Sequence, residues 1–156
     1  MACMTIHHWE PPQAGLAELR RVARGPVVVS TFEPERLPAW QQEHLAGGLA
    51  IERPRFPSTE AVATALGGRT RIEHVPTPGD CTDGFFEPFW NRPEQLLDPV
   101  VRAAQSIWAL LPAGRRGADR EGLEAALDSG AWDEEHGHLR EMDEYDGALR
   151  LVVSES

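Results

Sequence analysis

Two adjacent histidines and a tryptophan near the start of the chain have the residue types best suited to chemistry. They stand in the run Thr5-Ile6-His7-His8-Trp9, directly after a short apolar segment. An imidazole with an ordinary pKa of ~6.5 can transfer a proton near neutral pH or orient a bound substrate. A histidine at a strand end can also cap the strand or pack against its neighbours. For His7 both interpretations stay open, and for His8 we favour packing.

A loop rich in aromatic side chains is the second candidate. It carries two carboxylates and four aromatic rings: Asp80, Asp83, Phe85, Phe86, Phe89 and Trp90. Large apolar residues on a loop need a surface to cover. They could form a lid over a binding site, in which case they should be more exposed than the buried strand at residues 27–29. The alternative is that they pack on the helix that follows.

The remaining polar clusters favour neither a metal site nor a nucleophile. His136 and His138 stand two residues apart without a recognised ligand pattern, so we predict no metal site. Cys81 lies between carboxylates, which do not favour a thiolate. Cys3 and Cys81 are too few for a disulfide scaffold, which indicates free thiols in a reducing compartment.

The elements that must position the histidines form a parallel unit. Residues 2–6 and 26–32 have the apolar, β-branched character of buried strands. Between them, Leu16, Leu19 and Val22 recur at helical spacing. A strand, a crossover helix and a second strand in this order predict a right-handed parallel pair. The histidine run then follows the carboxyl end of the first strand.

Further elements are expected along the rest of the chain. We predict a short helix at residues 39–45, a helix opened by Ser58 and closed by Gly67-Gly68, a strand at 70–75, a long helix at 93–111, a linker at 113–120, a short helix at 121–127 and a final strand at 148–153.

Composition and charge narrow the class of protein. The net charge of −10 opposes binding to nucleic acid, whose partners usually present clustered positive charge. No segment approaches the ~18 apolar residues of a membrane span, and no signal peptide stands at the start. We therefore expect a cytoplasmic protein without a membrane or nucleic-acid partner. The chain of 156 residues suits a single domain, 1–156, with residues 77–147 as an insertion that covers the cleft.

An ordered set of motifs resembles the class I S-adenosylmethionine-dependent methyltransferases of the type 11 kind. The set is TIHHW, GLAELRRVARGPVVV, PGDCTDGFFEPFW, RPEQLLDP, SGAWDEEHG and a final LRLVV. Each piece alone is weak, but the ordered set is specific. The resemblance implies an α/β fold, the C-terminal half of a Rossmann-like methyltransferase sheet with helices and a long lid-like insertion.

In that fold, the fourth, fifth, seventh and sixth strands are expected from residues 2–6, 26–32, 148–153 and 70–75, the last of these antiparallel to its neighbours. The first three strands, the glycine-rich cofactor loop and the acidic residue that binds the ribose are expected before Met1. No glycine pair in the chain follows a strand as such a loop would.

The resemblance also assigns roles to the candidate residues. Thr5, Ile6 and His7 match the strand-end turn beside the methyl donor, with His7 as the catalytic candidate. Substrate-binding roles are implied for His8, Trp9, Asp80, Asp83, Phe85, Phe86 and Trp90.

The expected function is methyl transfer from S-adenosylmethionine to a small-molecule acceptor, with the isolated chain inactive for want of the cofactor loop. The alternative is a non-catalytic truncated paralogue or interaction module. Because removing three strands leaves residues 2–6 as an exposed edge, we also expect a homodimer or other association through that strand.

Overall fold

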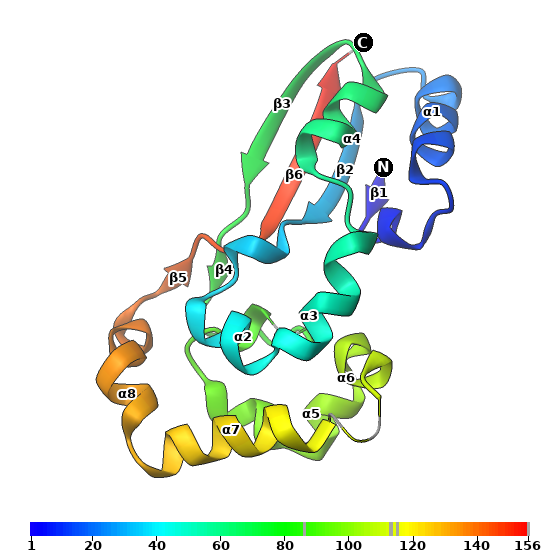
Figure 1. Ribbon diagram of the computed structural model, residues 1–156. Helices are drawn as coiled ribbons and strands as arrows, with labels where there is room; N and C mark the ends of the chain where they lie inside the picture. Colours follow the sequence, from blue (N-terminus) through cyan, green and yellow to red (C-terminus); the bar gives the residue numbers. More distant parts are fainter. Residues whose placement is uncertain (86, 113, 115, 156) are drawn as a thin grey trace. The chain divides into compact units, whose positions relative to one another are not determined.

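The protein folds into two compact units, each formed by separate stretches of the sequence. The computed structural model describes residues 1–85, 87–112, 114 and 116–155 (Figure 1). The first unit comprises Met1–Pro34, Arg53–Val75 and Ala148–Ser156, and the second comprises Glu35–Glu52 and Pro76–Gly147. The chain therefore leaves the first unit and returns to it twice. The segment 77–147 predicted as an insertion falls within the second unit, together with residues 35–52.

The first unit contains a four-stranded mixed sheet with two helices packed on it. Its elements in chain order are β1 (Ala2–Cys3), the 3-10 helix η1 (Ile6–His8), α1 (Pro12–Val22), β2 (Val27–Phe32), the 3-10 helix η3 (Arg53–Arg55), α4 (Thr59–Leu66), β3 (Arg69–His74) and β6 (Leu149–Glu155). A further 3-10 helix, η2 (Pro34–Arg36), spans the point in the sequence where the chain passes into the second unit.

The strands are arranged in the order β1-β2-β6-β3. β1 runs parallel to β2, with Ala2 opposite Val29. β6 is antiparallel to both of its neighbours, pairing Val152 with Val29 on one side and with Ile72 on the other. The predicted parallel unit and the antiparallel pairing of residues 70–75 are confirmed. β1 is shorter than predicted and lies at the edge of the sheet, where association through it stays a prediction.

The core of the first unit lies between one face of the sheet and the helices α1 and α4. Alternate residues of the strands face Leu16 of α1 and Val62 and Leu66 of α4 in one buried cluster. Ser58 caps α4 as predicted, its hydroxyl accepting a hydrogen bond from the backbone N–H of Ala61 at 3.1 Å. Gly67 and Gly68 end the helix with φ of 63° and 70°, a conformation that favours glycine.

A buried ion pair ties together three segments at the edge of the sheet where β2 ends. Nε of Arg150 lies 3.0 Å from Oε2 of Glu33, and the Arg150 and Glu33 side chains are only 1% and 14% exposed. The other carboxylate oxygen of Glu33 accepts a hydrogen bond from the Thr59 hydroxyl at 2.7 Å. The network therefore joins the end of β2 to the start of α4 and the start of β6.

The second unit is mostly helical. Its elements are α2 (Ala39–His44), α3 (Ala46–Glu52), β4 (Thr77–Pro78), the 3-10 helices η4 (Glu87–Phe89) and η5 (Pro93–Leu97), α5 (Pro99–Ala103), α6 (Ser106–Leu110), α7 (Arg116–Asp128), α8 (Ala131–His136), the 3-10 helix η6 (Gly137–Glu141) and β5 (Glu144–Tyr145). β4 and β5 form a small antiparallel sheet.

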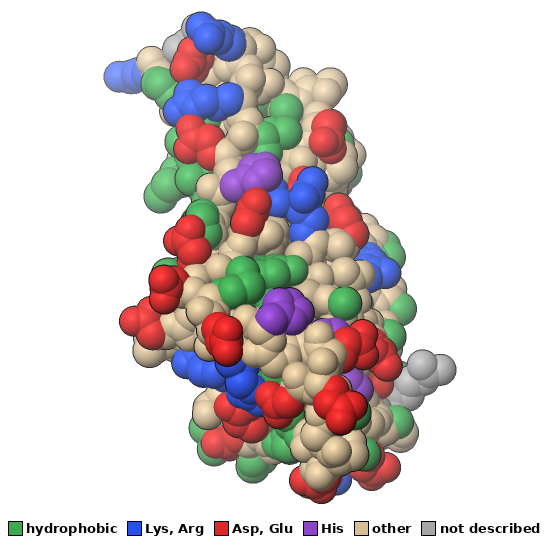
Figure 2. Space-filling model, turned by 90° about the vertical axis from the view of Figure 1, so that its left-hand side faces the viewer, with side chains coloured by type: hydrophobic (Ala, Val, Ile, Leu, Met, Phe, Trp, Pro, Cys, Tyr) green, Lys and Arg blue, Asp and Glu red, His purple; other side chains and the backbone are tan. Residues whose placement is uncertain are grey.

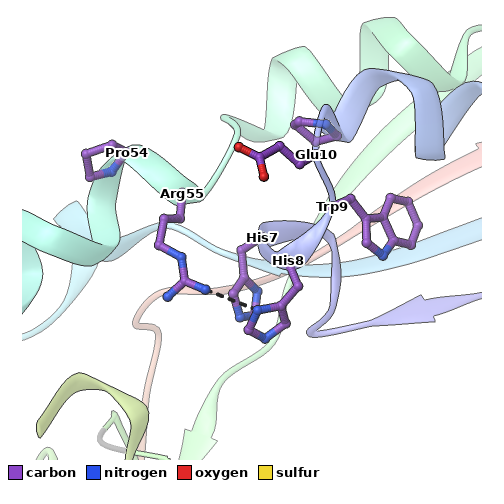
Figure 3. Close-up of a pocket in the computed structure, with 7 residues that line it drawn as sticks. His7, His8, Trp9, Glu10, Pro54 and Arg55 are labelled. Atoms are coloured by element: carbon purple, nitrogen blue, oxygen red, sulfur yellow. Dashed lines mark hydrogen bonds between the residues drawn. The ribbon is translucent and has the colours of Figure 1, made fainter. Parts of the chain in front are cut away.

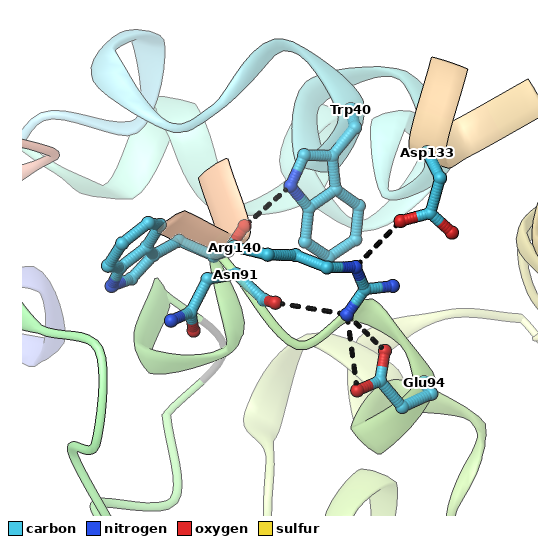
Figure 4. Close-up of polar contacts among 6 residues, drawn as sticks. Trp40, Asn91, Glu94, Asp133 and Arg140 are labelled. Atoms are coloured by element: carbon cyan, nitrogen blue, oxygen red, sulfur yellow. Dashed lines mark hydrogen bonds and ion pairs between the residues drawn. The ribbon is translucent and has the colours of Figure 1, made fainter. Parts of the chain in front are cut away.

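Buried tryptophans hold the second unit together. Trp40 meets Trp132 edge to face, with 5.7 Å between ring centroids, and its indole N–H donates to the carbonyl of Trp90 at 3.0 Å. Arg140 lies over the Trp132 ring, with 4.6 Å between its guanidinium carbon and the ring centroid. Its guanidinium also reaches Asp133 at 2.7 Å and Glu94 at 3.2 Å, as Figure 4 shows.

Two sequence predictions in this unit are wrong. The single helix expected at 93–111 is divided into η5, α5 and α6, because Asp98 and Gln105 adopt extended conformations. Asp98 precedes Pro99, which disfavours helical geometry at Asp98, and its carboxylate caps α5 through the N–H of Val100. The linker expected at 113–120 is wrong from Arg116 onward, because α7 begins there.

We predict that Glu33→Ala lowers the free energy of unfolding by about 3–5 kcal/mol, because it removes a carboxylate that is in direct contact with the buried Arg150 guanidinium. Urea unfolding followed by circular dichroism measures this change. Glu35→Ala is the matched control, since Glu35 is exposed, and should change stability by less than about 0.5 kcal/mol. Equal effects from the two substitutions would contradict the structural role of the ion pair.

Candidate functional site

The histidine turn lies directly after the carboxyl end of β1. The backbone N–H of Met4 donates to the carbonyl of Ser30 at 3.1 Å, so the pairing with β2 extends just beyond the strand. Met4 then takes a φ of 47°, and the chain turns into η1. Ile6 is fully buried and anchors the turn in the core. Ligands of open α/β sheets bind outside the carboxyl ends of parallel strands, which is where this turn lies.

His7 is held by aromatic packing on both sides. Its ring stacks on Phe56 with 4.5 Å between centroids and lies 3.9 Å from the His8 ring. Its Nδ1 is buried and has no hydrogen-bond partner among the described residues. Desolvation, together with the smaller electrostatic effects of His8 and Arg55, lowers the pKa of His7 from 6.5 to about 4. His7 is therefore uncharged at neutral pH.

An open pocket of about 360 Å³ surrounds this turn within the first unit. It is lined by His7, His8, Trp9, Glu10, Pro12, Pro54 and Arg55 (Figure 3). Arg55 points toward the two imidazole rings, and its guanidinium nitrogen lies 3.1 Å from Nδ1 of His8. Because an arginine can only donate, Nδ1 of His8 accepts and the ring hydrogen resides on Nε2. This volume falls within the range typical of small-molecule sites.

Trp9 lines the pocket but also packs against α1. A Cβ on Gly15 would lie 2.3 Å from Cε3 of Trp9, so the indole occupies the space above this glycine. Trp9 also packs against the core cluster of the unit. The indole therefore forms a wall whose position depends on a glycine in the neighbouring helix.

The other predicted cofactor-binding residues differ in what they can offer. Thr5 is exposed at the turn, whereas the Ile6 side chain is buried in the core and leaves only its backbone for a ligand. Thr5 and Ile6 do not appear among the residues that line the pocket. Their role in cofactor binding stays a prediction.

The loop residues predicted to bind substrate lie in the second unit, not in the unit that carries His7. Trp90 is fully buried and Phe89 is 8% exposed, so the expectation that the lid aromatics would be more exposed than residues 27–29 is wrong for Trp90. The reason is its hydrogen bonding and packing: its indole N–H donates to the carbonyl of Thr77 at 3.1 Å, and its ring stacks on Tyr145. Phe85 is half-buried, and Phe86 lies outside the described residues.

Asp80 and Asp83 are exposed on the same loop. Asp80 lines a second hollow of about 440 Å³ with Gly79, Asn91, Met142 and Asp143. Their substrate-binding roles stay predictions.

Arg55 and Glu10 are pocket residues that the sequence reasoning missed. Arg55 stands in the segment Arg53-Pro54-Arg55-Phe56-Pro57, which suggested only a loop because of its prolines. An arginine and an aromatic residue between two prolines was the available signal. Its position beside the histidines depends on the return of the chain from the second unit, which no local pattern predicts.

The described part of the chain lacks metal-binding clusters and membrane-spanning helices, and it shows no continuous basic surface in Figure 2. No three His, Cys, Asp or Glu side chains lie close enough together there to hold a metal ion. No helix there is both long and apolar enough to span a bilayer. On the face shown in Figure 2, the described basic side chains lie among acidic ones and form no continuous basic surface. Exclusion of nucleic acid stays a prediction.

Comparison with known proteins identifies a structural relative. No protein-family model and no curated protein matches the sequence. A solved structure from Anabaena variabilis, described as a "Putative methyltransferase from antibiotic biosynthesis pathway", aligns with a TM-score of 0.89 and 26% sequence identity. The alignment covers 99% of this chain and 64% of that protein. The chain therefore has a methyltransferase fold and spans less than two thirds of this relative.

We predict that His7 titrates with a pKa near 4, well below the ordinary 6.5. Between these two values the unfolded chain binds more protons than the folded one, so the free energy of unfolding falls as pH is lowered from 6.5 to 4. NMR titration of the His7 ring measures the pKa directly. His7→Gln removes this part of the pH dependence of stability, and a His7 midpoint at 6.5 or above would contradict the burial argument.

We also predict that Gly15→Ala destabilises the protein and moves Trp9. Alanine would favour the helix by about 1 kcal/mol, but overpacking costs about 1–3 kcal/mol, and a contact at 2.3 Å with the body of a ring cannot relax easily. Urea unfolding and the NMR shift of the Trp9 indole N–H report the two effects. Gly25→Ala is the matched control, because a Cβ there meets no atom within 4 Å. An unmoved Trp9 signal in Gly15→Ala would refute the contact.

Proposed function

We propose that this chain serves methyl transfer from S-adenosylmethionine to a small-molecule acceptor, with the histidine pocket on the acceptor side. The observation that carries the proposal is a pocket with two imidazoles at the carboxyl ends of parallel strands, in a chain with a methyltransferase fold. The name of the Anabaena relative supports the reaction class. Its antibiotic pathway favours a small-molecule acceptor over a macromolecule.

The described residues fit only one side of a cofactor site. His7 Nδ1 is a buried polar atom that finds no hydrogen-bond partner among the residues that the structure describes, as binding sites often carry before their ligand arrives. Among the residues described, however, no glycine-rich turn joins the end of a strand to a helix, so the N–H groups that would hold the ribose and the amino-acid end are missing. We therefore derive no chemical step through the cofactor.

The residues of the chain itself would bind and orient the acceptor. A pKa near 4 makes His7 a weak base, because its conjugate acid gives up a proton readily at neutral pH. We assign His7 an orienting role in preference to proton abstraction. Trp9, held by Gly15, would form an apolar wall that limits the access of water. When bound, S-adenosylmethionine supplies the electrophilic methyl group.

NMR titration of the chain with S-adenosylmethionine tests this function. We expect weak binding, with a dissociation constant of about 1–10 mM, because the site is incomplete. Backbone amide signals of residues 5–9 should shift, and S-adenosylhomocysteine should produce the same pattern.

Two outcomes would count against the proposal in different ways. The absence of shifts at residues 5–9 would favour the alternative, a non-catalytic interaction module with a methyltransferase-like fold. A micromolar dissociation constant by calorimetry would mean that this chain holds the cofactor by itself, and would overturn the assignment of an incomplete site.

A further inference from the structure

Arg55 brings a positive charge into the histidine pocket without a carboxylate to match it. The residue is half-buried, and the one side-chain hydrogen bond that it forms among the described residues is that to Nδ1 of His8 at 3.1 Å. Glu10 lines the same pocket but forms no ion pair with it in the described chain. Four of the five guanidinium N–H donors are therefore not engaged by an acceptor among the described residues.

This arrangement is unusual for an acid-rich chain. The protein has 25 acidic and 15 basic residues, so carboxylate partners are abundant. Among the described residues, arginines that form ion pairs with them include Arg21, Arg69, Arg71, Arg120, Arg140 and Arg150. Arg55 instead contacts an imidazole nitrogen that accepts a hydrogen bond but does not neutralise the charge. A guanidinium that is partly desolvated and unneutralised gains free energy when an anion binds.

The backbone beside Arg55 is held in place before any ligand binds. Arg55 ends the short helix η3, directly after Pro54, whose ring restricts the chain. The next residue, Phe56, packs against Phe32 at the end of β2 and against His7, with ring centroids 5.7 Å and 4.5 Å apart. The backbone that carries the guanidinium is thus held beside the pocket by the same aromatic contact that holds His7.

We propose that Arg55 binds a carboxylate group of the acceptor molecule, an inference that rests on the proposed function of this pocket. A planar guanidinium matches a carboxylate through two parallel hydrogen bonds. One positive charge balances one carboxylate. A phosphate dianion would leave a negative charge uncompensated in a pocket that also contains Glu10.

NMR titration with benzoate as the probe carboxylate tests the proposal without any methyl donor. We expect the Arg55 Nε–H and His8 ring signals to shift, with a dissociation constant of about 1–10 mM for so small a ligand. Benzamide, a neutral molecule of the same shape, should bind at least about tenfold more weakly, since it cannot form charge-assisted bonds. Inorganic phosphate should bind more weakly than benzoate.

Substitutions at Arg55 test whether this residue is responsible for benzoate binding. Arg55→Met keeps much of the side-chain volume and should weaken benzoate binding at least about tenfold, whereas Arg55→Lys keeps the charge without the planar fork and should lose less. Arg24→Met is the matched control, because Arg24 is exposed and does not line the pocket, and it should bind benzoate as the parent protein does.

Three results would overturn the inference. They are the absence of pocket shifts with benzoate, equal benzoate binding by Arg55→Met and the parent, and tighter Arg55-dependent binding of phosphate. Because the titration contains no S-adenosylmethionine, its failure would not count against the proposed methyl transfer, which the cofactor titration tests separately. Conversely, an absence of cofactor binding at residues 5–9 would not alter the benzoate result.

Discussion

The ion pair between Glu33 and Arg150 is the constraint on which the first unit depends. The chain leaves this unit after Pro34, returns at Arg53, leaves again after Val75 and returns at Ala148. Glu33 stands just before the first departure, Thr59 shortly after the first return and Arg150 just after the second, and the three side chains are bonded to one another. Because this contact is buried, breaking it would remove a favourable charge interaction in the core, where water cannot replace it. The network therefore holds the separate stretches of the first unit in register at the edge of the sheet that carries the pocket.

This arrangement also determines which charged and neutral side chains lie in the pocket. Arg55 and Phe56 lie between the first return of the chain and Thr59, so the contacts of Thr59 and Phe56 fix where the guanidinium can reach. Burial of the His7 ring disfavours its charged form, the nearby Arg55 charge adds a smaller effect in the same direction, and His7 stays neutral as a result. The pocket thus combines the permanent positive charge of Arg55 with the neutral His7 ring. Such a site selects by charge through the arginine and by shape through the rings.

The second unit shows how aromatic residues on an apparent loop can be core residues instead of a lid. Trp90 satisfies both its indole N–H and its carbonyl within the unit, and Trp40 and Trp132 complete the buried aromatic cluster. Large side chains with a polar handle are well suited to such a core, because short helices and 3-10 turns offer many carbonyl acceptors. The aromatic content of residues 80–90 therefore reflects, in part, how a unit with only a two-stranded sheet builds a stable interior.

Elements whose signals are short-range could be predicted from the sequence. The β-branched run of β2, the apolar spacing of α1, the Ser58 cap and the glycines after α4 each depend on a few neighbouring residues, and all were predictable. The motif order also led to the methyltransferase fold. The break at Asp98 follows from Pro99, a local signal that the helical spacing outweighed in the sequence prediction. The burial of Trp90 and the contact of Arg55 with His8, in contrast, depend on the tertiary structure. The contacts of Trp90 and Arg55 join residues far apart in the chain, and their partners are chosen by packing and desolvation, which no local periodicity records.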